Sequence, residues 1–179
     1  GSAIHILDTI GMNNILEEDK NLIQYTMNKL TEFKEVHIYG DTDIQNCPRA
    51  GTISFNISGM DHGLVAAILN DYFNIAVRNE CFCAHPYVQQ MLSTTHKEQL
   101  DNCESINSNL SWKMEPWMGM VRISYGIYNN IRDVDILVSS INKLITNKNY
   151  YKSQYKIDEN GDYKHINFQF SSDDFFSLT

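Results

Sequence analysis

Glycine and proline are scarce in this chain of 179 residues, which contains nine glycines and three prolines. That scarcity excludes collagen-like and low-complexity chains, and the 42% of hydrophobic and 11% of aromatic residues favour a globular domain. A chain of this length buries roughly 70% of the surface that its unfolded form exposes, so a core can form without disulfides or metal. We therefore expect one domain, or one domain followed by a tail.

Basic residues and long apolar runs are also lacking. Fourteen Lys and Arg residues oppose 22 Asp and Glu residues, and the formal net charge is −8. No basic cluster could track phosphates, so nucleic acid is a poor partner. The longest apolar run, residues 64–69, falls far short of the roughly 20 residues of a membrane span. We interpret Gly1-Ser2 as an expression scar rather than part of a signal peptide, and we expect a cytoplasmic protein without membrane contact.

Cysteine is sparse as well, and its spacing is uneven. Cys47, Cys81, Cys83 and Cys103 are too few to staple a secreted domain of this length, so we expect reduced thiols. Cys81, Cys83 and His85 alternate at a spacing that a metal could use. No second Cys/His pair stands at the spacing of a zinc finger, so we predict no metal site.

Hydrophobic periodicity predicts both helices and short strands. Apolar residues recur at helical spacing over 12–30 and after Asp61, and Asn130 followed by Asp133 marks the start of a helix that reaches Ile145. Runs typical of strands occur at 36–39, 52–57, 75–77 and 121–125. This order predicts an α+β fold: a two-layer domain with a small, largely antiparallel sheet and helices packed on one face.

Two segments depart from this pattern. Residues 93–118 are rich in Ser, Thr and Asn and contain Trp112 and Trp117, and we interpret them as a long excursion that the tryptophans anchor. Residues 147–179 form an aromatic tail, in which Asn160-Gly161 stands between two β-type runs. We expect a hairpin there that docks on its own domain, since a lone hairpin cannot keep its apolar surface out of water.

Reactive side chains are concentrated between Arg78 and Pro86, where a strand end meets an expected helix. The dipole of a helix favours the thiolate of a cysteine just ahead of its N-terminus, and Arg78 and His85 could add to this effect. Cys83 is therefore a candidate nucleophile. Composition alone gives equal weight to the alternative that Cys81 and Cys83 pack as small hydrophobes under a loop.

Arg122 is a second candidate because it alternates with apolar neighbours in a strand that otherwise belongs to a core. A guanidinium in such a place needs an anion, and it binds a carboxylate through two parallel hydrogen bonds. The anion is either a substrate carboxylate or an internal Asp or Glu. The residues alone slightly favour the internal pair.

Three stretches carry a family resemblance, in this order: RAGTISFN at 49–56, IAVR at 75–78 with CAHP at 83–86, and VRISYGIYN at 121–129. They resemble the C-terminal domain of class V aminotransferase-fold pyridoxal-phosphate enzymes, in particular cysteine desulfurases and selenocysteine lyases. The resemblance covers residues 3–146. It implies the small C-terminal domain of the fold-type I enzymes that use this cofactor.

By that resemblance, Cys83 corresponds to the cysteine that forms a persulfide, Arg122 to the arginine that holds the substrate carboxylate, and Arg78 to a second active-site arginine. The parent enzyme would be a homodimer that takes sulfur from L-cysteine with pyridoxal phosphate, releases alanine, and passes the sulfur to a possible protein acceptor. The family's cofactor lysine and phosphate-binding residues lie in a large domain ahead of this segment. We therefore expect no cofactor-binding residue in the fragment, which would be inactive alone.

Two local features bear on this resemblance. Many relatives have glycine where this chain has Glu80, which removes freedom to adopt a positive φ and adds negative charge near the thiol. The sequence STTHK at 93–97 is superficially similar to the residues around the cofactor lysine, and we treat it as coincidence.

Two other functions stay open at this point. One is an aminotransferase or other lyase of the same family in which Cys83 is not the nucleophile. The other is a non-enzymatic binding or sulfur-carrying module that uses the thiol alone.

Overall fold

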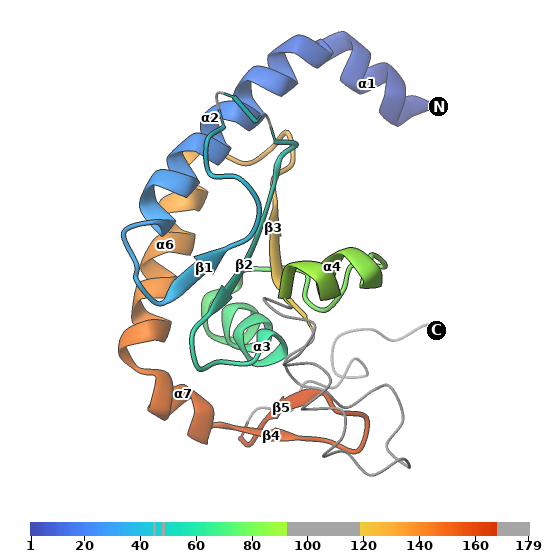
Figure 1. Cartoon of the computed structure of the whole chain (residues 1–179). Helices are drawn as coiled ribbons and strands as arrows, with labels where there is room; N and C mark the ends of the chain where they lie inside the picture. The colour runs from blue at the N-terminus through green and yellow to red at the C-terminus, as the bar shows by residue number, and fades with distance from the viewer. Residues whose placement is uncertain (45, 48, 93–118, 168–179) are drawn as a thin grey trace, which may run out of the picture.

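The computed structural model describes residues 1–44, 46–47, 49–92 and 119–167 (Figure 1). The excursion at 93–118 and the end of the tail at 168–179 lie outside the described residues, as do the roles expected there for Trp112 and Trp117. Among the described helices, none has the length and apolar content that a membrane crossing requires.

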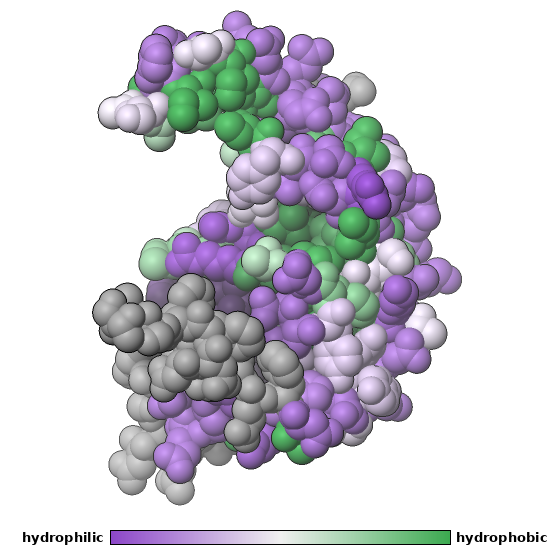
Figure 2. Space-filling view, turned by 180° about the vertical axis from the view of Figure 1, so that it is seen from behind, coloured by the Kyte–Doolittle hydropathy of each residue, from purple (hydrophilic) through white to green (hydrophobic). Residues whose placement is uncertain are grey.

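Two helices open the chain, α1 (Ser2–Ile10) and α2 (Met12–Leu30). Gly11 separates them with a φ of 91°, a left-handed value that glycine adopts without strain. The C-terminal half of α2 is buried, whereas α1 buries no residue. Figure 2 shows apolar side chains gathered on α1, which overhangs a hollow in the surface; Ile4 and Met12 are 72% and 60% exposed.

The main sheet is small and antiparallel, with the order β1 (Val36–Ile38), β2 (Thr52–Ile57), β3 (Val121–Ser124). Ile53 stands opposite Ile123, and Phe55 stands opposite Val121. Side chains alternate between the faces of a strand, so these four residues lie on one face, and all four are buried there. The β2 segment has the bounds that its alternation predicts.

Helices α2, α3 (His62–Phe73) and α6 (Ile131–Thr146) share that core with the sheet. The carboxylate of Asp61 caps α3 by accepting from the backbone N–H groups of Gly63 and Leu64. Asn130 and Asp133 form a capping box at the start of α6, as predicted. The predicted α+β class, with a small antiparallel sheet and helices against it, is confirmed.

Helix α4 (His85–Leu92) lies on the other side of β3 from α6 (Figure 1). It encloses a separate, smaller apolar cluster formed by Cys81, Val88 and Met120. Helix α4 and this cluster therefore cover only part of the second face of the sheet. The segment that carries Cys83 leads into α4.

The strand predicted at 75–77 is wrong. Asn74 ends α3 in the left-handed region at φ 54°, and the N–H of Ile75 donates to the carbonyl of Leu69, closing the helix. The backbone after this cap makes a single antiparallel bridge, between Arg78 and Arg122. The apolar residues of the segment still pack against the core, so periodicity alone could not separate this extended stretch from a strand.

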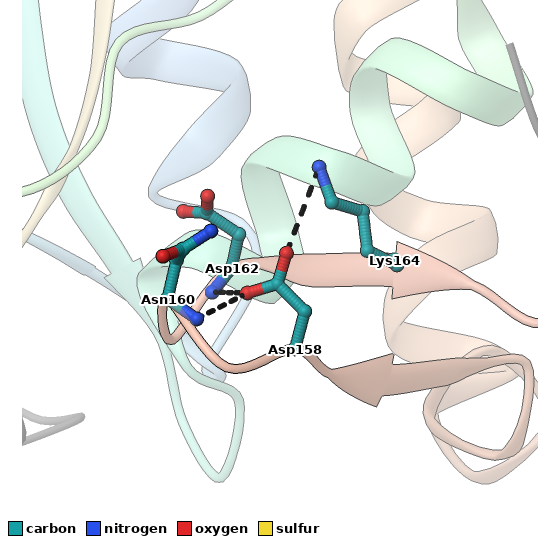
Figure 3. A network of polar contacts seen from close by, with 4 residues as sticks. All are labelled: Asp158, Asn160, Asp162 and Lys164. Atoms are coloured by element: carbon teal, nitrogen blue, oxygen red, sulfur yellow. Dashed lines mark hydrogen bonds and ion pairs between the residues drawn. The ribbon is translucent and has the colours of Figure 1, made fainter. Parts of the chain in front are cut away.

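The chain after α6 continues as α7 (Lys148–Ser153) and then as an antiparallel pair, β4 (Tyr155–Ile157) and β5 (Tyr163–His165). The carboxylate of Asp158 holds the turn by accepting from the N–H groups of Asn160 and Asp162 (Figure 3). Gly161, at φ 88°, supplies the left-handed residue that such a turn needs. A hairpin is thus present around the predicted Asn-Gly pair.

The hairpin docks on α3. The hydroxyl of Tyr155 donates to the carboxylate of Asp71 at 2.9 Å, and the hydroxyl of Tyr72 lies 2.8 Å from Nε2 of His165. The described part of the tail therefore packs against its own domain through Tyr155 and His165.

Candidate functional site

The loop between the Arg78 bridge and α4 has an unusual backbone. Glu80, Phe82 and Cys83 have φ values of 79°, 54° and 62°, in the left-handed region that favours glycine. Each such residue costs on the order of 1 kcal/mol and persists only where the surroundings impose it. The expectation that Glu80 lacks the freedom to adopt a positive φ is wrong, because it has a φ of 79° and carries the strain of that conformation.

Backbone pairing joins this loop to β3. The N–H of Arg78 donates to the carbonyl of Arg122 at 3.1 Å, and the N–H of Arg122 donates back at 2.7 Å. The N–H of Met120 donates to the carbonyl of Glu80 at 3.1 Å. The structure therefore brings two predicted site residues, Arg78 and Arg122, face to face on adjacent segments.

The two cysteines of the loop differ in their surroundings. Cys81 is buried, and burial, together with the negative charge of Glu80, raises the pKa of its thiol. Cys83 is exposed, and Nη2 of Arg78 lies 3.7 Å from its sulfur. It stands two residues ahead of the first residue of α4. Packing as a small hydrophobe describes Cys81 and not Cys83.

Arg122 is half-buried and makes no ion pair with the described residues. Its guanidinium stacks over the ring of Phe82, with Cζ 4.9 Å from the ring centroid. Its Nε is buried without a hydrogen-bond partner in the described part of the chain. The internal carboxylate that the residues alone slightly favoured is not found there. A guanidinium N–H group without a protein acceptor can bind an anionic ligand.

The sheet face around Arg122 is polar. Ser54 stands opposite Arg122, and Asn56 lies two residues further along β2 on the same face. The amide of Asn56 donates to the carbonyl of Gly119 at 2.9 Å and lies 3.2 Å from the hydroxyl of Tyr39, while its Oδ1 is buried without a partner among the described residues. The face thus places hydrogen-bonding groups on the side of the sheet that presents Arg122.

The described lysines bear on the implied cofactor, pyridoxal phosphate. A Schiff base needs a lysine, and the described lysines lie on α2, α6, α7, the hairpin and the turn after α2. None of them hydrogen-bonds to Arg78, Cys83 or Arg122 in that part of the chain. Over the same residues, no group of three His, Cys, Asp or Glu side chains is placed to hold a metal ion.

Sequence reasoning missed one side chain at this site, His62. Its ring reaches Asn79, beside Arg78, and packs on Gly119, just before β3. The sequence indicates that Asp61 caps a helix. It does not indicate where the side chain of His62 points, because His62 contacts Asn79 and Gly119, which are distant from it in the sequence.

A family model described as aminotransferase class-V matches residues 1–137. The cysteine desulfurase of Escherichia coli O127:H6 (strain E2348/69 / EPEC) is 27% identical over 144 residues, which cover 80% of this chain and 28% of that protein. The cysteine desulfurase of Yersinia pseudotuberculosis serotype O:1b (strain IP 31758) is 26% identical with the same coverage. The chain thus spans less than a third of the length of these relatives.

Solved structures agree. The apo structure of cysteine desulfurase from Thermococcus onnurineus NA1 matches with a TM-score of 0.60 and 28% identity, covering 80% of this chain and 29% of that one. The cysteine desulfurase CsdA from Escherichia coli matches with a TM-score of 0.58 and 18% identity over 80% of this chain and 28% of its own, a likeness of fold alone. With three quarters of its residues matched by the family model, the chain belongs to the aminotransferase class-V family.

Proposed function

We propose that this chain is the C-terminal domain of a pyridoxal-phosphate-dependent cysteine desulfurase-like enzyme, in which Cys83 receives the sulfur of L-cysteine. One observation carries the proposal: the exposed thiol of Cys83 lies 3.7 Å from the Arg78 guanidinium, on a loop paired with the strand that presents Arg122. Relatives named cysteine desulfurase, of which the chain spans 28%, support it.

Each of the three residues has a distinct role. Arg122, which makes no ion pair in the described part of the chain, binds the substrate carboxylate and orients the amino acid. Arg78 places its guanidinium 3.7 Å from the Cys83 sulfur, where its positive charge attracts the attacking sulfur atom, an effect kept modest by the exposure of both groups. The positive φ of Cys83 turns its side chain out of the loop, where it is exposed to substrate.

The chemical step transfers the sulfur of L-cysteine from its Cβ carbon to the sulfur of Cys83. The thiolate of Cys83 attacks the sulfur of L-cysteine, so that an S–S bond forms while the substrate Cβ–S bond breaks. The electron pair of the broken bond stays with Cβ, which then takes a proton, and alanine leaves. Pyridoxal phosphate, when bound to the parent protein, would supply the electron sink that makes the bond cleavable. The terminal sulfur of the Cys83 persulfide then passes to a thiolate of an acceptor protein.

Activity of the parent protein tests this proposal. The protein that contains this domain is incubated with pyridoxal phosphate and L-cysteine, and alanine is quantified. We expect Cys83→Ser to abolish alanine release and Cys47→Ser, at an exposed thiol outside the loop, to leave it unchanged. Full alanine release by Cys83→Ser would indicate another family member in which this thiol is not the nucleophile. Sulfur loading of Cys83 without cofactor or substrate turnover would indicate a thiol-based carrier.

A further inference from the structure

His62 is the first residue of α3, and the N-cap residue Asp61 fixes the first turn of this helix. The Asp61 carboxylate accepts from the N–H groups of Gly63 and Leu64 at 2.8 and 3.3 Å. Such a cap fixes the first turn of a helix and, with it, the direction of its side chains. The His62 ring therefore stands on a rigid base.

The ring contacts both segments that carry the arginines. Nδ1 of His62 lies 3.4 Å from Nδ2 of Asn79, the residue after Arg78. On the other side the ring lies against Gly119, so closely that a Cβ there would stand 2.6 and 2.7 Å from its Cδ2 and Cε1. Only glycine allows this approach. One imidazole thus joins the start of the cysteine loop to the residue that leads into β3.

The surroundings favour a neutral ring. Burial lowers the pKa of His62, and the charges of Asp61 and Glu80, which raise it, only partly offset that effect. A neutral imidazole offers one N–H donor and one acceptor nitrogen, and either can pair with a side-chain amide. The contact with Asn79 is therefore a neutral hydrogen bond.

The hairpin supports the same turn from outside. A Cβ on Gly63 would stand 3.3 Å from Cδ2 of Tyr163, so the β5 side chain packs directly on the backbone beside His62. Burial raises the pKa of Tyr163, and the nearby Asp61 carboxylate adds to the shift. The first turn of α3 is therefore held between the hairpin and the cysteine loop.

We infer that His62 is a positioning residue, which holds the Arg78–Cys83 loop against β3 so that the Cys83 thiol stays beside Arg78. The inference deepens the proposed function, because it concerns the loop that carries the proposed sulfur acceptor. A loop with three left-handed residues that are not glycine relaxes unless its surroundings oppose relaxation. The imidazole of His62 opposes this relaxation from α3, through its contacts with Asn79 and Gly119.

Thiol reactivity of the isolated chain tests the inference. The rate of Cys83 alkylation by iodoacetamide at pH 7 is measured by peptide mass spectrometry, with exposed Cys47 as the reference thiol. His62→Leu should lower the ratio of the Cys83 rate to the Cys47 rate about threefold to fivefold, since the exposed Arg78 contact is lost. His62→Asn should keep the ratio, because its amide occupies the position of Nδ1.

Two controls keep the result interpretable. Tyr25→Phe removes a hydrogen bond between α2 and α6, to Asp135, and should leave the ratio unchanged. Gly119→Ala displaces the ring without altering it and should lower the ratio as His62→Leu does; it replaces His62→Leu if that variant fails to fold. Unfolding midpoints of all variants are recorded alongside.

The outcomes separate the inference from the proposed function. A wild-type ratio in His62→Leu or in Gly119→Ala overturns the inference, and so does an equal loss in His62→Leu and His62→Asn, which would indicate a general packing role. None of these outcomes bears on whether the parent protein releases alanine through Cys83. Conversely, a parent that releases none leaves the His62 ratios intact.

Discussion

Replacing Arg122 with leucine should cost the isolated chain no stability. Arg122 lies in a buried strand, where a charged side chain is tolerated when it has a partner. In the described part of the chain its partners are the Phe82 ring and the backbone of Arg78. The backbone pairing does not depend on the side chain, so Arg122→Leu leaves it in place.

The magnitude follows from the two side-chain effects that remain. Loss of the stacking of Arg122 on Phe82 costs about 0.5–1 kcal/mol at a partly exposed site. Removal of the buried Nε, which has no hydrogen-bond partner among the described residues, recovers a desolvation penalty of about 1–3 kcal/mol. The free energy of unfolding of Arg122→Leu should therefore be unchanged or higher by up to about 2 kcal/mol.

Urea denaturation measures the free energy of unfolding of Arg122→Leu beside that of a matched control variant. Arg49→Leu is the control, because Arg49 donates from Nε to the carbonyl of Asp41 at 2.9 Å and from Nη2 to that of Tyr39 at 2.8 Å. Losing these bonds should cost about 1–3 kcal/mol. A fall of about 3–5 kcal/mol in Arg122→Leu, at an unchanged denaturant slope, would identify Arg122 as the partner of a buried carboxylate and refute the substrate-binding role.

Three further predictions concern the loop and the tail. Cys83 should be alkylated faster than Cys47 and much faster than buried Cys81, whose thiol pKa is raised; preferential labelling of Cys47 or Cys103 by mass spectrometry would remove the support for the nucleophile. Glu80→Gly should be more stable to urea than Glu80→Ala by about 1 kcal/mol, because both lose the charge and only glycine relieves the positive φ; equal midpoints would mean that the loop is unstrained. Tyr155→Phe should speed amide hydrogen exchange in β4 and β5 about tenfold by removing the bond to Asp71, whereas Tyr25→Phe, which breaks a similar bond to Asp135, should not; slow exchange in both would place hairpin docking elsewhere.

Local signals in the sequence predicted those elements whose stability is decided locally. The bounds of α2 and β2 follow from periodicity, and the start of α6 follows from the Asn130–Asp133 capping box. The hairpin follows from Asn160-Gly161 in the same way. Helix α1 was not predicted, although Ala3, Ile6, Leu7 and Ile10 recur at helical spacing, and in the structure it buries no residue.

Tertiary contacts decide the remainder. Whether residues 75–77 form a strand depends on which backbone lies beside them, and in the described part of the chain the bridge forms one residue later, between Arg78 and Arg122. The pairing of these two arginines, the positive φ of Glu80 and the reach of His62 to Asn79 arise only once α3 and β3 are packed. The candidate residues could be named from the sequence, whereas their arrangement around the thiol could not.

The central claim is that Cys83 is the sulfur acceptor. The most direct test supplies L-cysteine labelled with a heavy sulfur isotope, with pyridoxal phosphate, to the parent protein, then traps persulfides by alkylation and maps the label by peptide mass spectrometry. Labelled persulfide on Cys83, and its loss in Arg122→Leu at low L-cysteine, is the result predicted. Alanine release with label on another cysteine, or on none, would contradict the claim.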